Sequence, residues 1–255
     1  MSEDQNSATF INTDNLTSRK HISEKALSEI NSMCISSVSH DFRTPLSIIY
    51  ANLQLLEYHD FNLDKETIKD AFSLSRLAIK SLLRVLDKVT VIDSINKGRL
   101  EYKPAKVCLE TLCTNLVKTL NEAEIATDRL IYIHDSSITE IEIDQYLFTS
   151  LFTHLIFNSL TYSKRDFKVV FESKLLSDNE IRFTVKDFGI GLSAAQLDVV
   201  NNFMTSDEKE LIDGIGLGLI IVKECLLLQK GTIHIASEPG KGSLFTICLP
   251  ISRNC

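Results

Sequence analysis

The residues best suited to chemistry in the first part of the chain lie in the run Ser39–Leu46. The surrounding apolar stripe has a helical period and falls almost opposite to His40, so we expect this imidazole to face solvent. Asp41 can accept a hydrogen bond from one ring nitrogen, which makes the other nitrogen more basic. Thr44 lies four residues on, on the same helical face. Ser39, His40 and Asp41 cannot form a hydrolase relay, because adjacent side chains on one helix diverge.

A second candidate site begins at Asp187, directly after a predicted strand, and continues to Gly189 and Gly191. Two glycines spaced by one residue permit a tight turn and a close approach of the backbone to a ligand. A carboxylate at the end of a strand can accept a hydrogen bond from an exocyclic amine such as that of adenine. Ordinary turns use the same residue types, so this motif alone is only moderately specific.

A third motif contains Gly214, Gly216 and Gly218 and precedes a predicted helix. Backbone N–H groups at a helix N-terminus, together with the helix dipole, bind phosphate. No strand immediately precedes these glycines and their spacing differs from the dinucleotide fingerprint, so that alternative is excluded.

Asn158 is a fourth candidate, on the helix predicted for residues 144–161. Its side-chain oxygen suits Mg²⁺, which prefers oxygen ligands and shares them with phosphates. A single helical asparagine is more often a polar surface residue, so the metal-binding interpretation depends on the other motifs in the chain.

The order of the four segments resembles that of the sensor histidine kinases of two-component signalling, over roughly residues 30–250. The run Ser39–Leu46 is similar to that family's phosphoacceptor box, and His154–Ser163 to its asparagine box. The segments Asp187–Gly191 and Gly214–Leu219 look like its two glycine boxes.

The resemblance implies that ATP and Mg²⁺ are the cofactors and that His40 is phosphorylated, with Asp41 assisting and Thr44 associated with phosphatase activity. It implies that the phosphoryl group moves on to an aspartate of a response regulator. The implied nucleotide contacts are Asn158, which also binds the metal, Thr161, Tyr162, Asp187, Gly189, Gly191, Gly214, Gly216 and Gly218.

Two departures from the family pattern motivate an alternative. His154 stands where the family often has asparagine, and Thr161 where it often has a phosphate-contacting lysine. A degenerate kinase acting as a regulator-binding or phosphatase module would tolerate both changes. An ATPase of the gyrase and mismatch-repair group would share the nucleotide motifs, but it needs no exposed helical histidine.

Residues 1–20 are polar and predict a mobile tail. Apolar residues then recur at spacings of three and four from His21 to Tyr58, which predicts a helix that Pro45 bends or loosens. Asp64 is the expected N-cap of a second helix. The stripe of that helix comprises Ile68, Phe72, Ile79, Leu82, Leu86, Val89 and Ile92. Residues 21–97 therefore predict a helical hairpin, and a two-fold dimer would bury both stripes in a four-helix bundle. The resemblance implies that this hairpin is the dimerisation and phosphotransfer domain.

Residues 98–255 predict one helical layer that covers one mixed sheet, and the resemblance implies that this is the ATP-binding domain. The fold class is α+β: an N-terminal helical hairpin followed by an α/β sandwich. We expect a lid over residues 192–213, with a mobile loop at 206–210. The predicted helices span 109–120, 144–161 and 214–229, and the strands 129–134, 138–143, 167–175, 181–186, 231–236 and 243–249.

The amino-acid composition narrows the possible partners and cellular location of the protein. The 255 residues carry a formal net charge of −7, which speaks against a nucleic-acid partner. The six cysteines form no Cys-x-x-Cys pair, which favours reduced thiols and a cytoplasmic location. No membrane span or signal peptide is expected, since no apolar run approaches about 18 residues. With no tryptophan and 7% aromatic residues, we expect a mainly aliphatic core.

Overall fold

The computed structural model describes residues 39, 41–58, 63–122, 128–135, 140–164, 166–177, 179–206 and 216–251. The predicted tail, the first half of the first predicted helix, His40, Gly214 and residues 207–210 of the expected loop at 206–210 lie outside these residues.

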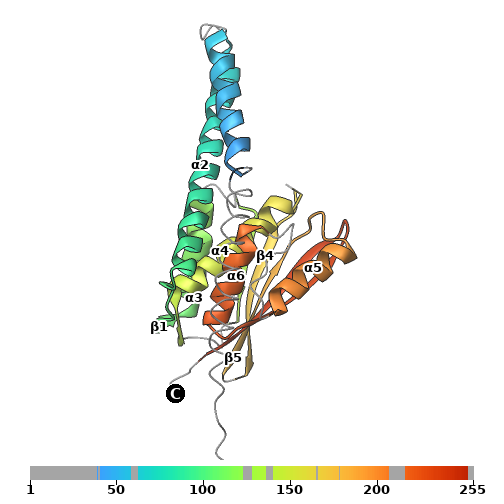
Figure 1. Ribbon diagram of the computed structural model, residues 1–255. Coiled ribbons are helices and arrows are strands. Elements are labelled where there is room, and N and C mark those ends of the chain that lie inside the picture. Colours follow the sequence, from blue (N-terminus) through green and yellow to red (C-terminus); the bar gives the residue numbers. More distant parts are fainter. Residues whose placement is uncertain are drawn as a thin grey trace, which may run out of the picture.

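A long helical hairpin forms the N-terminal part of the described chain and projects beyond the rest of the molecule (Figure 1). Residues 41–58 form one helix, which continues through Pro45, and α2 (Lys65–Asn96) forms the other. Asp64 is the N-cap of α2, as predicted: its side chain accepts hydrogen bonds from the backbone N–H groups of Glu66 and Thr67. No helix in the described ranges has both the length and the apolar character needed to cross a membrane.

The buried face of α2 differs from the predicted stripe. Its buried residues are Ala71, Ala78, Val85 and Ile92, spaced seven apart. Only Ile92 belongs to the predicted stripe, whereas Phe72, Ile79 and Leu86 are exposed in the single chain. A seven-residue spacing keeps one helix face toward its neighbours, and the small side chains let the backbones approach closely. The heptad of smaller residues was not predicted, because large apolar residues were weighted more strongly, whereas Phe72, Ile79 and Leu86 lie on the face that a second hairpin is expected to cover.

A five-stranded sheet forms the base of the second part, in the order β2-β4-β5-β7-β6. The strands are β2 (Leu130–His134), β4 (Val169–Ser177), β5 (Glu180–Lys186), β6 (Thr232–Glu238) and β7 (Gly242–Pro250). Only the β2–β4 pair is parallel, so the predicted mixed and mostly antiparallel sheet is confirmed. A separate antiparallel pair joins β1 (Ala105–Cys108), which was not predicted, to β3 (Glu140–Ile143).

Helices α3 (Leu109–Glu122), α4 (Gln145–Tyr162) and α6 (Leu217–Leu228) form the predicted helical layer, and α2 runs beside it (Figure 1). Helix α5 (Ala194–Thr205) was not predicted, because residues 192–213 were assigned to a lid. Its start carries a capping box between Ser193 and Gln196, a signal that was present in the sequence.

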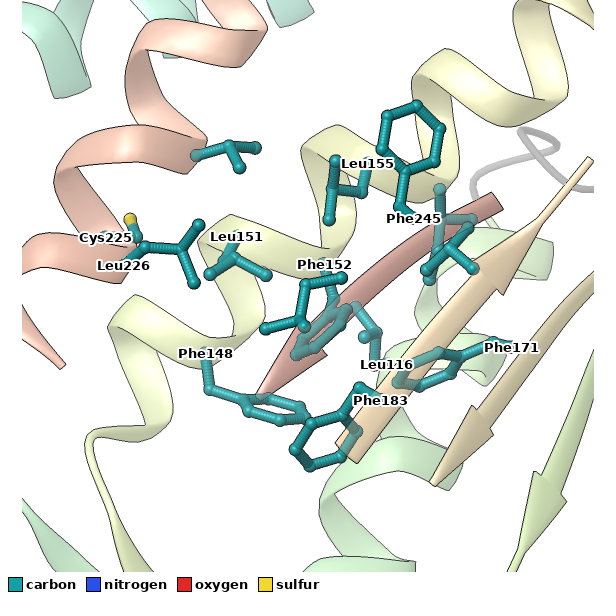
Figure 2. Packing of buried hydrophobic residues seen from close by; sticks show 14 of the residues in the cluster. Leu116, Phe148, Leu151, Phe152, Leu155, Phe171, Phe183, Cys225, Leu226 and Phe245 are labelled. Carbon is teal, nitrogen blue, oxygen red and sulfur yellow. The ribbon is translucent and has the colours of Figure 1, made fainter. Parts of the chain in front are cut away.

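The core is mainly aliphatic, as predicted, but a group of aromatic rings lies at its centre. Phe148 and Phe152 of α4 pack against Phe171 of β4 and Phe183 of β5 (Figure 2). Ring centroids are 4.6 Å apart between Phe148 and Phe152 and 5.0 Å apart between Phe152 and Phe183. Four of the few aromatic residues are concentrated here, where they fix α4 on the sheet.

Candidate functional site

Asp187 is buried at the end of β5, with 4% of its surface exposed. Its Oδ1 accepts hydrogen bonds from the backbone N–H groups of Gly189 at 2.9 Å and Ser243 at 3.1 Å. Burial raises the pKa of Asp187 above its ordinary value, while both hydrogen bonds lower it. The Ser159 hydroxyl on α4 also lowers this pKa, although its Oγ makes no geometrically sound hydrogen bond. The carboxylate is therefore oriented, with Oδ2 still able to accept from a ligand.

Gly189 joins the Asp187 turn to the end of α4. A Cβ at Gly189 would lie 2.3 Å from the carbonyl oxygen of Tyr162, so only glycine fits. The next N–H, from Ile190, donates to the same oxygen at 3.2 Å. This contact brings the end of the helix that carries Asn158 against the predicted turn.

Gly191 and Gly242 have positive φ angles of 66° and 101°. A Cβ at Gly191 would lie 2.1 Å from the Glu238 carbonyl oxygen, and one at Gly242 would lie 2.3 Å from the Asp187 carbonyl oxygen. Gly242 and Ser243 were not predicted as part of the site, although the glycines of Gly240-Lys241-Gly242 indicate a turn at this point of the sequence.

Asn158 lies next to the start of α6. A Cβ at Gly218 would stand 3.5 Å from Asn158 Nδ2 and 3.7 Å from its Oδ1. Gly216 is the exposed N-cap of α6 and has no side-chain cap, so this helix end offers backbone N–H groups to a ligand. The structure thus brings Asn158 and two of the three predicted glycines together; Gly214 lies outside the described residues.

Thr161 and Tyr162 lie at the C-terminal end of α4. The Thr161 hydroxyl donates to the Phe157 carbonyl oxygen at 2.8 Å, a bond within its own helix. The Tyr162 side chain is 58% exposed, and the structure uses its carbonyl oxygen to hold the Gly189 turn. Their nucleotide contacts stay predictions.

Arg129 is a supporting residue that the sequence did not reveal. Its guanidinium donates to the carbonyl oxygens of Leu160 and Ser163 at 3.3 Å and of Lys164 at 3.0 Å. Its Nε donates to the Phe167 carbonyl oxygen at 3.4 Å. A cation at the C-terminal end of α4 satisfies carbonyls that a helix leaves without partners.

His154 faces the start of α6, one helical turn before Asn158. Its Nδ1–H donates to the Ser150 carbonyl oxygen at 2.8 Å, and burial lowers the pKa of His154. The ring is therefore neutral, with Nε2 as its acceptor. A Cβ at Gly218 would lie 3.7 Å from His154 Cδ2.

The helix at 41–58 carries the remaining predicted residues. Thr44 is exposed and Asp41 is half-buried, while His40 lies outside the described residues. Burial lowers the pKa of Lys88 on α2, and the Asp41 charge opposes this shift, so the start of the first helix and this part of α2 are within electrostatic range. In the described ranges, no three His, Cys, Asp or Glu side chains are grouped to hold a metal ion.

Two family models match this chain. Residues 30–98 match the His Kinase A (phospho-acceptor) domain, and residues 143–253 match the histidine kinase-, DNA gyrase B- and HSP90-like ATPase. Sensor protein EvgS of Escherichia coli K12 is 29% identical over 228 residues, which cover 86% of this chain. The chain belongs to the sensor histidine kinases.

Other sensor histidine kinases are similar to this chain over a comparable length. Sensor protein kinase WalK of Staphylococcus epidermidis is 27% identical over 224 residues, or 85% of this chain. The matched part is only 19% of EvgS and 36% of WalK. The chain thus corresponds to only part of each of these longer kinases.

Solved structures share the fold. The histidine kinase ThkA in complex with the response regulator protein TrrA matches with a TM-score of 0.62 at 18% identity, covering 92% of this chain and 66% of that one. Acinetobacter baumannii histidine kinase AdeS matches with a TM-score of 0.58 at 19% identity, covering 84% of this chain and 98% of that one. At these identities the likeness concerns the fold: a helical hairpin followed by an α/β sandwich.

Proposed function

We propose that this histidine kinase uses Mg-ATP to phosphorylate its own His40 and then passes the phosphoryl group to an aspartate of a response regulator. The observation that carries the proposal is the convergence of Asp187, Gly189, Asn158 and Gly218 around the end of α4 and the start of α6. The family models that match residues 30–98 and 143–253 support it.

Asp187 would bind the adenine. Two backbone donors hold its Oδ1, so the carboxylate is already oriented and Oδ2 would accept the hydrogen bond of the exocyclic amine. A hydrogen bond of this kind to a charged group contributes about 1.5–3 kcal/mol. Tyr162 and Thr161 border the same turn from the end of α4.

The phosphates would lie at the start of α6, where the N–H groups after Gly216 and the helix dipole favour negative charge. Asn158 fits a Mg²⁺ ligand, because its amide stands beside this helix end and offers a neutral oxygen that phosphate oxygens can supplement. Magnesium, when bound, neutralises charge on the phosphates.

His40 would attack the γ-phosphorus with one ring nitrogen while the other keeps its proton. Asp41 accepts the hydrogen bond of that proton and so raises the nucleophilicity of the attacking nitrogen. Thr44, exposed one helical turn further on, would position water when the kinase dephosphorylates its regulator.

Residues 21–97 would form the dimerisation and phosphotransfer domain, and residues 98–255 the ATP-binding domain, acting in the cytoplasm where ATP is found. The exposed apolar residues on both hairpin helices support a homodimer, since a second hairpin would bury them. The ThkA–TrrA complex, whose kinase shares this fold, supports a response regulator as partner.

Incubation with γ-labelled ATP and Mg²⁺ tests the proposal. We expect a phosphoprotein whose label is lost in acid and kept in base, as a phosphoramidate requires. Steady phosphate release without a labelled protein would instead indicate a simple ATPase. A chain that binds a regulator but never becomes labelled would indicate a degenerate module.

A further inference from the structure

Helix α2 directs two cations at the helix that carries Asn158. The Arg84 guanidinium carbon lies 4.8 Å from the centroid of the Phe157 ring, and Lys88 Nζ lies 5.8 Å from it. Both positive groups are therefore held against one aromatic ring, one residue before Asn158. A cation–π contact orients such groups without neutralising their charge.

The two cations are poorly compensated. Burial lowers the pKa of Arg84 and of Lys88, and the Arg84 charge lowers that of Lys88 further. Arg84 Nε is buried without a hydrogen-bond partner. Neither side chain forms an ion pair within the described ranges, and the Asp41 charge offsets part of the burial effect on Lys88. Two partly desolvated like charges side by side favour an anion between them.

Their position links the two halves of the proposed reaction. The hairpin helices are antiparallel, with Asn52 Nδ2 donating to Ser75 Oγ at 3.3 Å. Counting back from this pair places Asp41, which follows His40 in the sequence, level with the turn of α2 that contains Arg84 and Lys88, and the Asp41 charge acts on Lys88. On the other side, Phe157 adjoins Asn158, which packs against the start of α6.

Space for an anion is present at the same place. A cavity of about 340 Å³ lies between α2, α3 and α4, and Arg84, Lys88, Phe157 and His154 are part of its wall. Asp87 is the one acidic side chain in the wall, and the neutral His154 adds no charge, so the net charge of the wall is positive.

We propose that Arg84 and Lys88 form an interdomain site that binds the phosphoryl group as it passes from ATP to His40. The inference rests on the proposed function. In that step the bond from the γ-phosphorus to the bridging oxygen of ADP breaks, and a nitrogen–phosphorus bond forms. The ring keeps its own proton, and negative charge is spread over the phosphoryl oxygens and the leaving ADP oxygen. Two cations beside this path stabilise that charge.

Single-turnover labelling of Arg84→Gln, Lys88→Gln and the double variant, at saturating Mg-ATP, tests the site. We expect each single change to slow labelling at least tenfold while nucleotide affinity stays within about twofold, since transition-state charge is affected and ground-state binding is not. Arg76→Gln is the matched control, because Arg76 is an exposed cation of α2 outside the cavity wall. It should label at the wild-type rate.

Two further variants separate charge from packing. Arg84→Lys keeps the charge and should retain most of the rate. Phe157→Leu removes the aromatic ring but leaves both cations, and should lose less than Arg84→Gln. Equal labelling by the wild type and the double glutamine variant would overturn the site while leaving the proposed function standing. Equal losses in Phe157→Leu and Arg84→Gln would also overturn it, in favour of domain docking. A wild type that never labels would refute the proposed function itself.

Discussion

Asp187 and Ser243 are joined by two hydrogen bonds across the ends of β5 and β7. The Asp187 N–H donates to the Ser243 carbonyl oxygen at 2.9 Å, and the Ser243 N–H donates to Asp187 Oδ1 at 3.1 Å. The sheet itself therefore fixes both the backbone and one carboxylate oxygen of the residue that would bind adenine. A ligand then meets an acceptor that is already oriented.

Changing Asp187 to Asn should weaken nucleotide binding without unfolding the domain. The amide oxygen can still accept from the Gly189 and Ser243 N–H groups, but the amide nitrogen cannot accept from adenine. We expect a loss of affinity of roughly 10- to 100-fold, the equivalent of one hydrogen bond to a charged group. Calorimetric titration with a non-hydrolysable ATP analogue measures it, with the melting temperature as the control for folding. Unchanged affinity would remove Asp187 from the site.

The same variant should change how stability depends on pH. Burial raises the folded-state pKa of Asp187 above the ordinary 3.8. Ionisation therefore costs the folded state more than the unfolded one. The contribution of the protonated group is complete below the ordinary pKa and is lost as pH rises through the folded pKa. The nucleotide-free Asp187→Asn variant should gain in unfolding free energy relative to wild type between about pH 4 and pH 7. Urea unfolding at these two pH values measures the gain. A loss of unfolding free energy relative to wild type over this pH range would contradict the account.

Changing Gly189 to Ala should separate the end of α4 from the Asp187 turn. The added methyl would stand 2.3 Å from the Tyr162 carbonyl oxygen, so the turn must shift. We expect a lower melting temperature and at least a tenfold loss of nucleotide affinity. Gly216→Ala is the control for stability, because a Cβ there meets nothing within 4 Å. Equal melting temperatures for Gly189→Ala and Gly216→Ala would show that the turn is not fixed by this contact.

Changing Arg129 to Met should destabilise the ATP-binding domain, because carbonyl oxygens at the end of α4 lose their donors. The expected loss is about 2 kcal/mol of unfolding free energy, as for hydrogen bonds to a charged group. Urea unfolding measures it. Arg99→Met, at an exposed position just after α2, should cost little, and a similar loss in both variants would refute the capping role.

Changing Phe72 or Leu86 to Glu should convert the proposed dimer to a monomer. These side chains of α2 are 54% and 53% exposed in the single chain, on the apolar face that a second hairpin would cover. Light scattering after size exclusion gives the mass directly. Leu227→Glu is the control, since Leu227 is 52% exposed on α6, which is not one of the hairpin helices. A wild-type protein that is monomeric at high concentration would contradict the dimer.

The sequence predicted most elements, because periodicity and capping act over a few residues. It placed the Asp64 cap and the helix and strand around Asn158 and Asp187 correctly. Helix α5 was missed although the capping box at Ser193 was visible, since the segment had been assigned to a lid.

The rest depends on contacts between distant segments. Arg129 binds carbonyls 31 to 38 residues later, and Ser243 meets Asp187 across 56 residues, so no local pattern marks either residue. The buried heptad positions Ala71 and Ala78 of α2 were not predicted from the sequence for a different reason. Small residues carry little apolar signal, yet the close approach of two helices selects them.

The most direct measurement of the central claim is the labelling of His40→Gln by γ-labelled ATP, beside wild type and Asp187→Asn. Wild type should carry an acid-labile, base-stable label. His40→Gln should carry none while its affinity for the nucleotide analogue stays at the wild-type value. Asp187→Asn should bind the analogue roughly 10- to 100-fold more weakly and carry correspondingly less label at sub-saturating ATP. Undiminished acid-labile label on His40→Gln would contradict the account, because the phosphoryl group would then reside on another residue.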